Sequence, residues 1–416
     1  MRVDFMKTRV LILTLDSPHL DRRTLLFAQA LQQEGFEVCV LTPYAKAEEG
    51  FEDIHVVDLI QESSSTRLVF GLKEWFKRWS PCWVFRFLKR CYKTLFTRNG
   101  HLHLLFTSKM LERAKEFRPS VVIASDLPTL PLAWQLKRTL GSRLIYDSHE
   151  FYTEQAFLSS KDKRELRKIE ARLLPWVDLL ITINGDIAQL FRRRYGVGDV
   201  RVIQNAFLSS CPEKKYIHDL LGIGRERRLV LYQGQFLKYR NLEQLVKLAR
   251  YFREIALVLV GWGELEAVLK KRCRRYGILD KTVYFLPKIP QRDLVAYASS
   301  ASLGVIPYPS VDLNTRYCTP NKLFEFISAS LPVVANENLV MLKKILRRYG
   351  IGFCLDFHQA EAAAKKIEEV ASETELLRLY RNNLELAKRE LCWERERKKL
   401  VAWVNGLFAK RAKCAE

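Results

Sequence analysis

The sequence lacks the cysteine and histidine patterns of disulfide-rich and zinc-binding proteins. Its nine cysteines are odd in number and scattered, and no two form a Cys-x-x-Cys pair. This pattern argues against a disulfide framework and a zinc site, and it favours a reducing compartment. Among the seven histidines only His101 and His103 have a spacing that suits a metal, and neither has a cysteine or carboxylate beside it. We therefore expect no metal site.

Long apolar segments are also missing. The run Val10–Leu15 is too short for a secretory signal, and an aspartate follows it instead of a small-residue cleavage site. The stretch Leu294–Val311 carries no charge, but Gly304, Pro307 and Pro309 suit a helix end followed by a strand, not a transmembrane helix. The sequence therefore predicts a cytoplasmic protein.

Acidic residues are few relative to basic ones. The chain of 416 residues has 47 acidic and 69 basic residues, which gives a net charge of +22. Such a charge favours an anionic partner: nucleic acid, an acidic membrane surface or phosphorylated substrates. The sequence contains no nucleic-acid recognition motif, so we expect no nucleic-acid partner. The hydrophobic content of 48% is enough for a packed core, and the length suits two domains.

The chain alternates short apolar runs with helical patterns, which is typical of parallel α/β sheets. One series covers residues 1–207 and a second covers 208–390, with a polar linker at Pro212–Arg227. Residues 391–416 contain a final helix that we expect to pack back toward the first domain. The fold class we predict is therefore α/β, with two doubly wound, Rossmann-like domains. They would face each other across a cleft, and such clefts are favoured ligand sites.

The segment 67–98 differs in composition from the rest of the chain. It contains nine basic residues, one acidic residue and nine aromatic residues, including three of the chain's eight tryptophans. Basic and aromatic amphipathic helices suit a membrane interface, although a pair of core helices with a solvated basic face is the alternative. The side chains that we expect to contact an anionic membrane surface are Trp75, Trp79, Arg86, Lys89, Arg90 and Lys93.

Two polar clusters occupy positions that suit a ligand site. His149 and Glu150 follow the predicted strand Arg143–Tyr146, and parallel sheets bind ligands beyond the carboxyl ends of their strands. Lys322 and Glu325 lie near the start of a predicted helix, whose free N–H groups can hold a phosphate while the glutamate accepts bonds from a sugar diol. This arrangement suits a nucleotide-sugar. The alternatives are a structural histidine and an ordinary helix with a solvated Lys–Glu pair.

Six strings, in the right order along the chain, resemble one protein family. They are Tyr146-Asp147-Ser148-His149-Glu150, Val202-Ile203-Gln204-Asn205, Tyr232-Gln233-Gly234 followed by Arg240, Val260-Gly261-Trp262-Gly263, Pro320–Phe326 with Leu331–Ala335, and Trp393-Glu394. Together they resemble the retaining, family-four glycosyltransferases of group 1, which have the two-domain GT-B fold. The resemblance extends from about Arg9 to Leu400 and does not include the segment 67–98.

The resemblance implies transfer of a sugar from a UDP- or GDP-linked donor, with retention at the anomeric carbon. It makes His149, Arg240 and Glu325 the catalytic residues, at the reacting sugar, the leaving diphosphate and the ribose. Fixed cations would replace a metal, because the Asp-x-Asp motif of the other glycosyltransferase fold occurs nowhere in the sequence. The donor-binding residues that it implies are Gly234, Gln235, Gly263, Thr319, Asn321, Lys322 and Leu323. The residues on the acceptor side are Asp16, Ser17 and Arg22.

The resemblance and the basic segment together predict a glycan or lipid-linked acceptor at the inner face of the cytoplasmic membrane. Synthesis of a cell-surface polysaccharide, a lipopolysaccharide or a glycolipid is the expected context. The chain departs from the family pattern at three positions: Tyr317 replaces a glutamate, Gln235 an arginine and Ser330 a glycine. The alternative functions are a nucleotide-sugar epimerase or hydrolase on the same fold, and an inactive membrane-surface scaffold.

Overall fold

The structure of the chain is a computed structural model that describes residues 8–15, 22–42, 54–58, 101–207 and 213–412. Asp16, Ser17 and the segment 67–98 lie outside these residues, so the roles expected of them stay predictions. In that segment the predicted membrane contacts are Trp75, Trp79, Arg86, Lys89, Arg90 and Lys93. Within the described ranges, no helix combines the length and the apolar character needed to span a bilayer.

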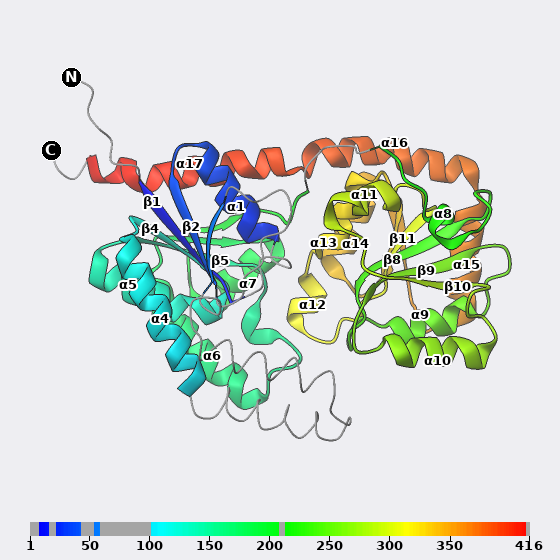
Figure 1. Cartoon of the computed structure of the whole chain (residues 1–416), viewed down its shortest axis with the longest axis horizontal. Coiled ribbons are helices and arrows are strands. Elements are labelled where there is room, and N and C mark those ends of the chain that lie inside the picture. Colours follow the sequence, from blue (N-terminus) through cyan, green and yellow to red (C-terminus); the bar gives the residue numbers. More distant parts are fainter. Residues whose placement is uncertain (1–7, 16–21, 43–53, 59–100, 208–212, 413–416) are drawn as a thin grey trace.

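The first half of the chain forms a seven-stranded parallel sheet in the order β3-β2-β1-β4-β5-β6-β7 (Figure 1). Along β1, Val10 and Ile12 belong to one apolar cluster, and Leu11 and Leu13 belong to another. Both faces of the sheet are therefore covered, which explains why its strands read as continuous apolar runs. The strands are β1 (Arg9–Leu13), β2 (Glu37–Thr42), β3 (His55–Asp58), β4 (Val121–Ser125), β5 (Arg143–Ser148), β6 (Leu179–Thr182) and β7 (Val200–Val202). The helical elements are α1 (Arg22–Gln33), α4 (His101–Phe117), η1 (Leu127–Thr129), α5 (Leu130–Leu140), η2 (Tyr152–Glu154), α6 (Ser160–Leu173), η3 (Leu174–Trp176) and α7 (Gly185–Tyr195).

The second half repeats this design with a six-stranded parallel sheet in the order β10-β9-β8-β11-β12-β13. Its strands are β8 (Leu229–Gln235), β9 (Ala256–Trp262), β10 (Val283–Leu286), β11 (Leu303–Ile306), β12 (Val333–Asn336) and β13 (Gly352–Leu355). Its helices are α8 (Ile217–Leu221), α9 (Leu242–Ala249), α10 (Glu266–Tyr276), α11 (Gln291–Ala298), α12 (Leu313–Tyr317), α13 (Asn321–Ser328), α14 (Val340–Tyr349), α15 (Ala360–Ser372) and α16 (Thr374–Glu390). The strand order reverses between β1 and β4 in one sheet and between β8 and β11 in the other. Ligands bind at such switch points, beyond the carboxyl ends of the strands.

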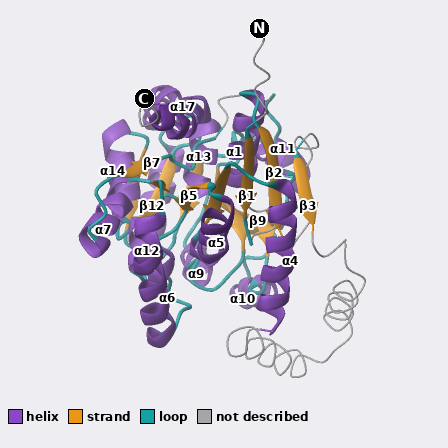
Figure 2. Ribbon diagram, turned by 90° about the vertical axis from the view of Figure 1, so that its left-hand side faces the viewer, coloured by secondary structure: helices purple, strands orange, loops and turns teal. Residues whose placement is uncertain are grey.

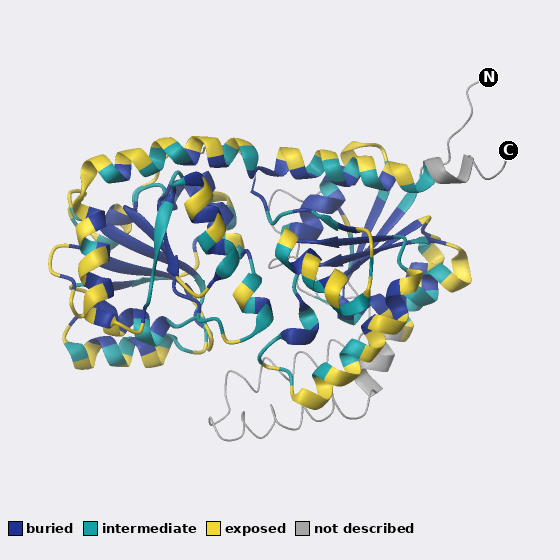
Figure 3. Ribbon diagram, turned by 180° about the vertical axis from the view of Figure 1, so that it is seen from behind, coloured by how far each residue is buried: buried dark blue, intermediate teal, exposed yellow. Residues whose placement is uncertain are grey.

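The two parallel sheets flanked by helices confirm the predicted GT-B architecture. Figure 3 shows buried strands inside each half and exposed residues on the outer helices. Two details differ from the sequence prediction. The polar linker contains the short helix α8, in which Ile217 and His218 are buried. Strand β13 was not predicted, because it is a half-buried edge strand whose four residues show no alternating pattern.

The last helix, α17 (Trp393–Ala412), runs from the second domain back along the first (Figure 1), and Figure 2 shows it nearly end-on above the first sheet. Trp393 is 4% exposed, and its ring stacks on Phe27 of α1 with centroids 5.9 Å apart. Glu396 is 1% exposed and accepts a hydrogen bond from the backbone N–H of Gln204 at 3.0 Å. At the edge of this contact, Arg397 donates to Glu34. The helix therefore ties the second domain to α1 and to the segment that joins the two domains.

We predict that Trp393→Ala lowers the free energy of unfolding of the first domain by about 3–5 kcal/mol, because it removes a large buried ring from a packed contact. Urea denaturation followed by circular dichroism measures the change. Leu386→Ala on α16 is the control, because Leu386 is 55% exposed and should have little effect. Equal loss in the two variants would contradict the packing role of Trp393.

Candidate active site

Two adjoining cavities lie between the domains. The first has a volume of about 410 Å³, and the second has a volume of about 510 Å³. Glu150, Arg240, Asn321 and Lys322 line both, so the cavities are two compartments of one cleft. The first, which we call the donor cavity, is otherwise lined by Arg22, Gln233, Gly234, Gln235, Val260, Gly261, Trp262, Lys288, Ile289, Gln291, Leu294 and Glu325. The second, which we call the histidine cavity, contains His149, Asp126, Asn205, Asn314 and Thr319 among its lining residues.

Two cations and an open helix end converge where the cavities meet. Helix α13 begins after Pro320, and no side chain caps its first N–H groups. The Lys322 ammonium lies 5.3 Å and 5.4 Å from the ring centroids of Tyr232 and Tyr308, and the Arg240 guanidinium lies 4.3 Å from that of Tyr308. Among the described residues, neither cation has an ion-pair partner. Helix N-termini and unpaired cations favour a bound anion, so this point suits a diphosphate.

Close packing of two turns shapes the floor of the donor cavity. Gly234 has φ of 121°, and a Cβ there would lie 2.5 Å from the Lys322 ammonium. A Cβ on Gly261 would lie 2.0 Å from the carbonyl oxygen of Gly234. Only glycine fits at both positions, because the β8 turn contacts the β9 turn on one side and Lys322 on the other.

Glu325 also lines the donor cavity and is held by two glutamines. It is 8% exposed and accepts hydrogen bonds from Gln233 Nε2 at 2.5 Å and from Gln291 Nε2 at 3.5 Å. The Gln233 Oε1 atom is buried and has no hydrogen-bond partner. A carboxylate held in this way keeps lone pairs for hydroxyl donors in the cavity, such as a ribose diol.

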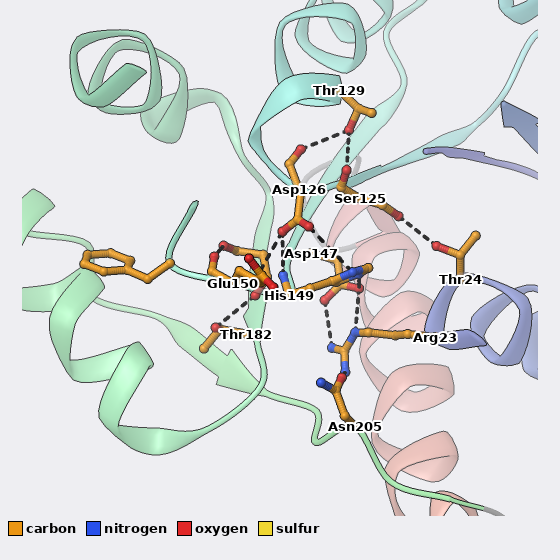
Figure 4. A network of polar contacts seen from close by, with 12 residues as sticks. Arg23, Thr24, Ser125, Asp126, Thr129, Asp147, His149, Glu150, Thr182 and Asn205 are labelled. Carbon is orange, nitrogen blue, oxygen red and sulfur yellow. Dashed lines mark hydrogen bonds and ion pairs between the residues drawn. The ribbon is translucent and has the colours of Figure 1, made fainter. Parts of the chain in front are cut away.

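On the first domain, His149 is held by two aspartates (Figure 4). Its Nε2 atom lies 2.8 Å from Asp147 Oδ2, and its Nδ1 atom lies 3.8 Å from Asp126 Oδ2. The backbone N–H of His149 donates to Asp126 Oδ1 at 2.8 Å. Asp126 has φ of 60°, a conformation that costs a non-glycine residue about 1–3 kcal/mol. The carboxylate of this strained aspartate accepts from the backbone of the turn after β5 and so fixes the backbone position of His149.

Asp147 is a buried carboxylate whose partner is Arg23. It is 1% exposed, and the Nε and Nη2 atoms of Arg23 donate to its two oxygens, each at 2.8 Å. Burial alone would raise the pKa of Asp147, but Arg23, and after it His149, hold that pKa well below the usual range. Asp147 therefore stays ionised and can hold the histidine ring in one orientation.

Arg23 also connects the histidine to the segment between the domains. Its Nη1 atom donates to the carbonyl of Ile203 at 2.8 Å and to Asn205 Oδ1 at 3.2 Å. The Asn205 amide then donates to the carbonyl of Thr319 at 3.4 Å, just before α13. The buried guanidinium of Arg23 thus contacts Asp147, which holds His149, and also the segment 203–205, which joins the two domains.

Helix α12 supplies further hydrogen bonds across the cleft. Asn314 accepts from the backbone N–H of Phe151 at 2.8 Å and donates to Glu150 at 3.2 Å. Asn184, the N-cap of α7, donates to the carbonyl of Tyr317 at 2.8 Å. These contacts place the loop that carries His149 against the donor side of the cleft.

The structure brings most of the predicted site residues together. His149 and Thr319 line the histidine cavity, Gly234, Gln235 and Glu325 line the donor cavity, and Arg240, Asn321 and Lys322 line both. Arg22, predicted on the acceptor side, lines the donor cavity, with its guanidinium 3.8 Å from the ring centroid of Phe207. Asp16 and Ser17 lie outside the described residues.

Two predicted donor-binding residues line neither cavity. Leu323 is completely buried in the core of the second domain because it lies on the inner face of α13. Gly263 packs against the neighbouring turn, where a Cβ would lie 2.5 Å from the carbonyl oxygen of Phe236. Their expected roles in donor binding stay predictions. Tyr317, which stands where a glutamate was expected, also lines neither cavity, and its side chain packs against the core of the first domain.

Sequence reasoning missed Arg23, Asp126, Gln233, Gln291 and Asn314 as site residues. Gln233 was inside a recognised string, so its position before Gly234 was a usable signal. Arg23 lies in the first turn of α1 in a basic pair, and Asp126 directly follows strand β4. Their partners are 124 and 23 residues away in the sequence, so no local pattern could reveal them.

Comparison with known families identifies the chain. The family model of glycosyl transferases group 1 matches residues 213–386, and that of the glycosyl transferase 4-like domain matches residues 20–206. This chain belongs to the group 1 glycosyltransferases. The first match covers all lining residues of the donor cavity except Arg22 and Glu150, and the second covers these two and the loop that carries His149. No curated protein sequence matches it significantly.

Solved structures of other proteins share the fold. Sucrose-phosphate synthase from Thermosynechococcus elongatus has a TM-score of 0.72 at 17% identity, over 97% of this chain and 100% of its own. HepE of Anabaena in complex with UDP-glucose has a TM-score of 0.67 at 15% identity, over 96% and 99%. WaaG, which is involved in lipopolysaccharide biosynthesis, has a TM-score of 0.64 at 12% identity, over 94% and 98%.

We predict that Arg23→Gln destabilises the protein by about 3–5 kcal/mol at pH 7, because it leaves the buried Asp147 carboxylate without its partner. The pKa of Asp147 is lowered in the native protein, so its ion pair stabilises above the unfolded pKa of about 3.9 and loses effect as the pH falls. In the variant, Asp147 can take up a proton instead. The difference in melting temperature from wild type should therefore shrink between pH 7 and pH 4.

The control for this prediction is Arg225→Gln, which removes an exposed ion pair with Asp219 and should change the melting temperature little at either pH. A destabilisation by Arg23→Gln that stays constant or grows on acidification would contradict the assigned pair.

Proposed function

We propose that this glycosyltransferase moves a hexosyl group from a UDP- or GDP-linked donor to a glycan or lipid-linked acceptor, with retention and without a metal. The single observation that carries the proposal is the arrangement at the shared wall of the two cavities. Arg240, Lys322 and the open end of α13 meet there, with Glu325 on one side and His149 on the other.

This arrangement suits stabilisation of a leaving diphosphate. As the bond between the anomeric carbon and the diphosphate oxygen breaks, negative charge grows on that oxygen. Arg240, Lys322 and the N–H groups of α13 are already oriented toward this charge, so they stabilise the transition state more than the ground state. Glu325 would bind the ribose, and Lys288 and Ile289 also line the donor cavity.

The histidine cavity provides the place for transfer. His149 would contact the sugar as it acquires oxocarbenium character, and Asp147 holds the ring in place for this. The acceptor hydroxyl would approach on the face that the diphosphate leaves, form the new bond to the anomeric carbon and give its proton to the leaving diphosphate oxygen. Cys318 also lines this cavity, but burial raises the pKa of its thiol to about 12, so it stays protonated and is not a nucleophile.

The acceptor and the membrane contact are proposed on more distant grounds. The histidine cavity has a volume of about 510 Å³, which leaves space for an acceptor group beside the donor sugar. This space favours transfer over an epimerase or hydrolase. The net charge of +22 and the sequence of the segment 67–98 support contact with an anionic surface, the inner face of the cytoplasmic membrane. The solved HepE complex with UDP-glucose supports a nucleotide-sugar donor, and WaaG, which is involved in lipopolysaccharide biosynthesis, supports a cell-surface glycan as product.

We predict that Arg240→Ala lowers kcat about a hundredfold, because it removes one charge at the leaving diphosphate. Glu325→Ala should instead raise KM for the donor, since it contacts the ribose in both ground and transition states. Turnover of a panel of UDP- and GDP-sugars measures both. Lys238→Ala is the control, because Lys238 is exposed on the same loop as Arg240 and lines neither cavity. Full activity of Arg240→Ala would sink the assignment of the diphosphate site.

We also predict that turnover persists in excess EDTA and that the product keeps the anomeric configuration of the donor. Within the described residues no group of three or more His, Cys, Asp or Glu side chains is placed to hold a metal, and the proposal gives the charge-stabilising role to Arg240 and Lys322. Proton NMR of the anomeric signal during turnover measures the configuration. Inversion at that carbon, or loss of activity that Mg²⁺ or Mn²⁺ restores, would contradict the mechanism. Release of free sugar without an acceptor would favour the hydrolase, and failure to bind UDP or GDP would favour the scaffold.

A further inference from the structure

A third cavity lies outside the catalytic cleft, on the far side of α12. Its volume is about 820 Å³, and it shares no lining residue with the donor or the histidine cavity. Its walls are the segments after β11, β12 and β13, together with α14. It therefore lies beyond the carboxyl ends of three parallel strands, the end of a sheet where ligands bind. The lining residues are Pro309, Ser310, Val311, Arg316, Asn336, Glu337, Asn338, Val340, Lys343, Lys344, Arg347 and His358.

Positive charge dominates this cavity. Lys343 and Arg347 lie four residues apart on one face of α14, and Arg316 comes from α12. Among the described residues, none of these three side chains has an ion pair or a hydrogen bond; Arg316 only stacks near Tyr317. Lys344 is different, because its ammonium binds Asp186 of α7 at 2.7 Å. Glu337 is the one acidic residue in the lining, so the charges remain unbalanced.

A buried amide faces the same cavity. Asn336, at the end of β12, is 1% exposed. Its Oδ1 atom accepts from the backbone N–H of Asn338 at 3.1 Å, while its Nδ2 atom donates to no described residue. This Nδ2 atom is not fully enclosed, so it is available to donate to a polar ligand atom in the cavity.

We propose that this cavity is a second anion site, which binds the phosphoryl group of a phosphorylated ligand. Two arginines and a lysine supply forked and point-charge donors of the kind that bind phosphate oxygens, and Asn336 supplies a neutral donor at the base. The phosphoryl group comes from either a soluble phosphate ester or a phospholipid headgroup. The site is independent of the proposed transfer reaction, because none of its residues lines either catalytic cavity.

The test uses pyrophosphate as the probe and the full chain, with saturating UDP and GDP present to occupy the donor cavity. Isothermal titration calorimetry should show one binding site in the wild type. The double variant Lys343→Gln with Arg347→Gln should bind pyrophosphate at least about tenfold more weakly, because two charged hydrogen-bond donors are lost. The matched control is Lys365→Gln with Lys398→Gln, which removes the same charge at exposed positions outside the cavity and should bind like wild type.

A second arm identifies the source of the phosphoryl group. Flotation with phosphatidylcholine vesicles that contain phosphatidic acid compares the same two double variants. Weaker flotation of the cavity variant than of the control supports a lipid headgroup, while equal flotation together with the calorimetric difference supports a soluble ligand. If the two double variants bind both probes equally, the basic lining is only a solvated surface and the proposal is wrong. Unchanged circular dichroism and donor turnover show that the cavity variant is folded.

Discussion

The buried carboxylate of Asp147 is the interaction on which the site depends. A carboxylate on a residue that is 1% exposed is costly unless it is paired and hydrogen-bonded. Here the Arg23 guanidinium is the ion-pair partner and donates one hydrogen bond to each oxygen of Asp147. The same guanidinium contacts the carbonyl of Ile203, and the same carboxylate contacts His149. One ion pair thus connects the histidine to the segment that joins the two domains.

The two sides of the cleft divide the chemistry between them. The second domain supplies fixed positive charge through Arg240, Lys322 and the free end of α13. It also supplies the carboxylate of Glu325, which can accept hydrogen bonds. The first domain supplies His149 and the strained Asp126 that positions it. Hydrogen bonds from Asn184 and Asn314 cross between the sides, so each half of the site is oriented by the other. A diphosphate and its sugar would therefore meet groups that need little rearrangement, and such preorganisation is usually the largest electrostatic contribution to catalysis.

The sequence sufficed to predict the fold and to select several residues that line one cavity, because their signals are local. Short apolar runs that alternate with helical patterns predicted the sheets. Gly234, Lys322 and Glu325 lie within short strings that resemble family motifs. It failed where the function of a residue depends on distant contacts. Arg23 meets Asp147 across 124 residues, a contact that no local string could predict. The consequence of having Tyr317 in place of a glutamate could not be predicted either, because its side chain packs against the core of the first domain and lines neither cavity.

The most direct test of the account is a crystal structure of the protein with a bound nucleoside diphosphate, either UDP or GDP. We predict that the diphosphate lies at the N-terminus of α13 within hydrogen-bond distance of Arg240 and Lys322, that Glu325 contacts the ribose, and that His149 faces the vacant sugar position. A nucleotide bound elsewhere, or one whose diphosphate contacts neither cation, would contradict the central claim.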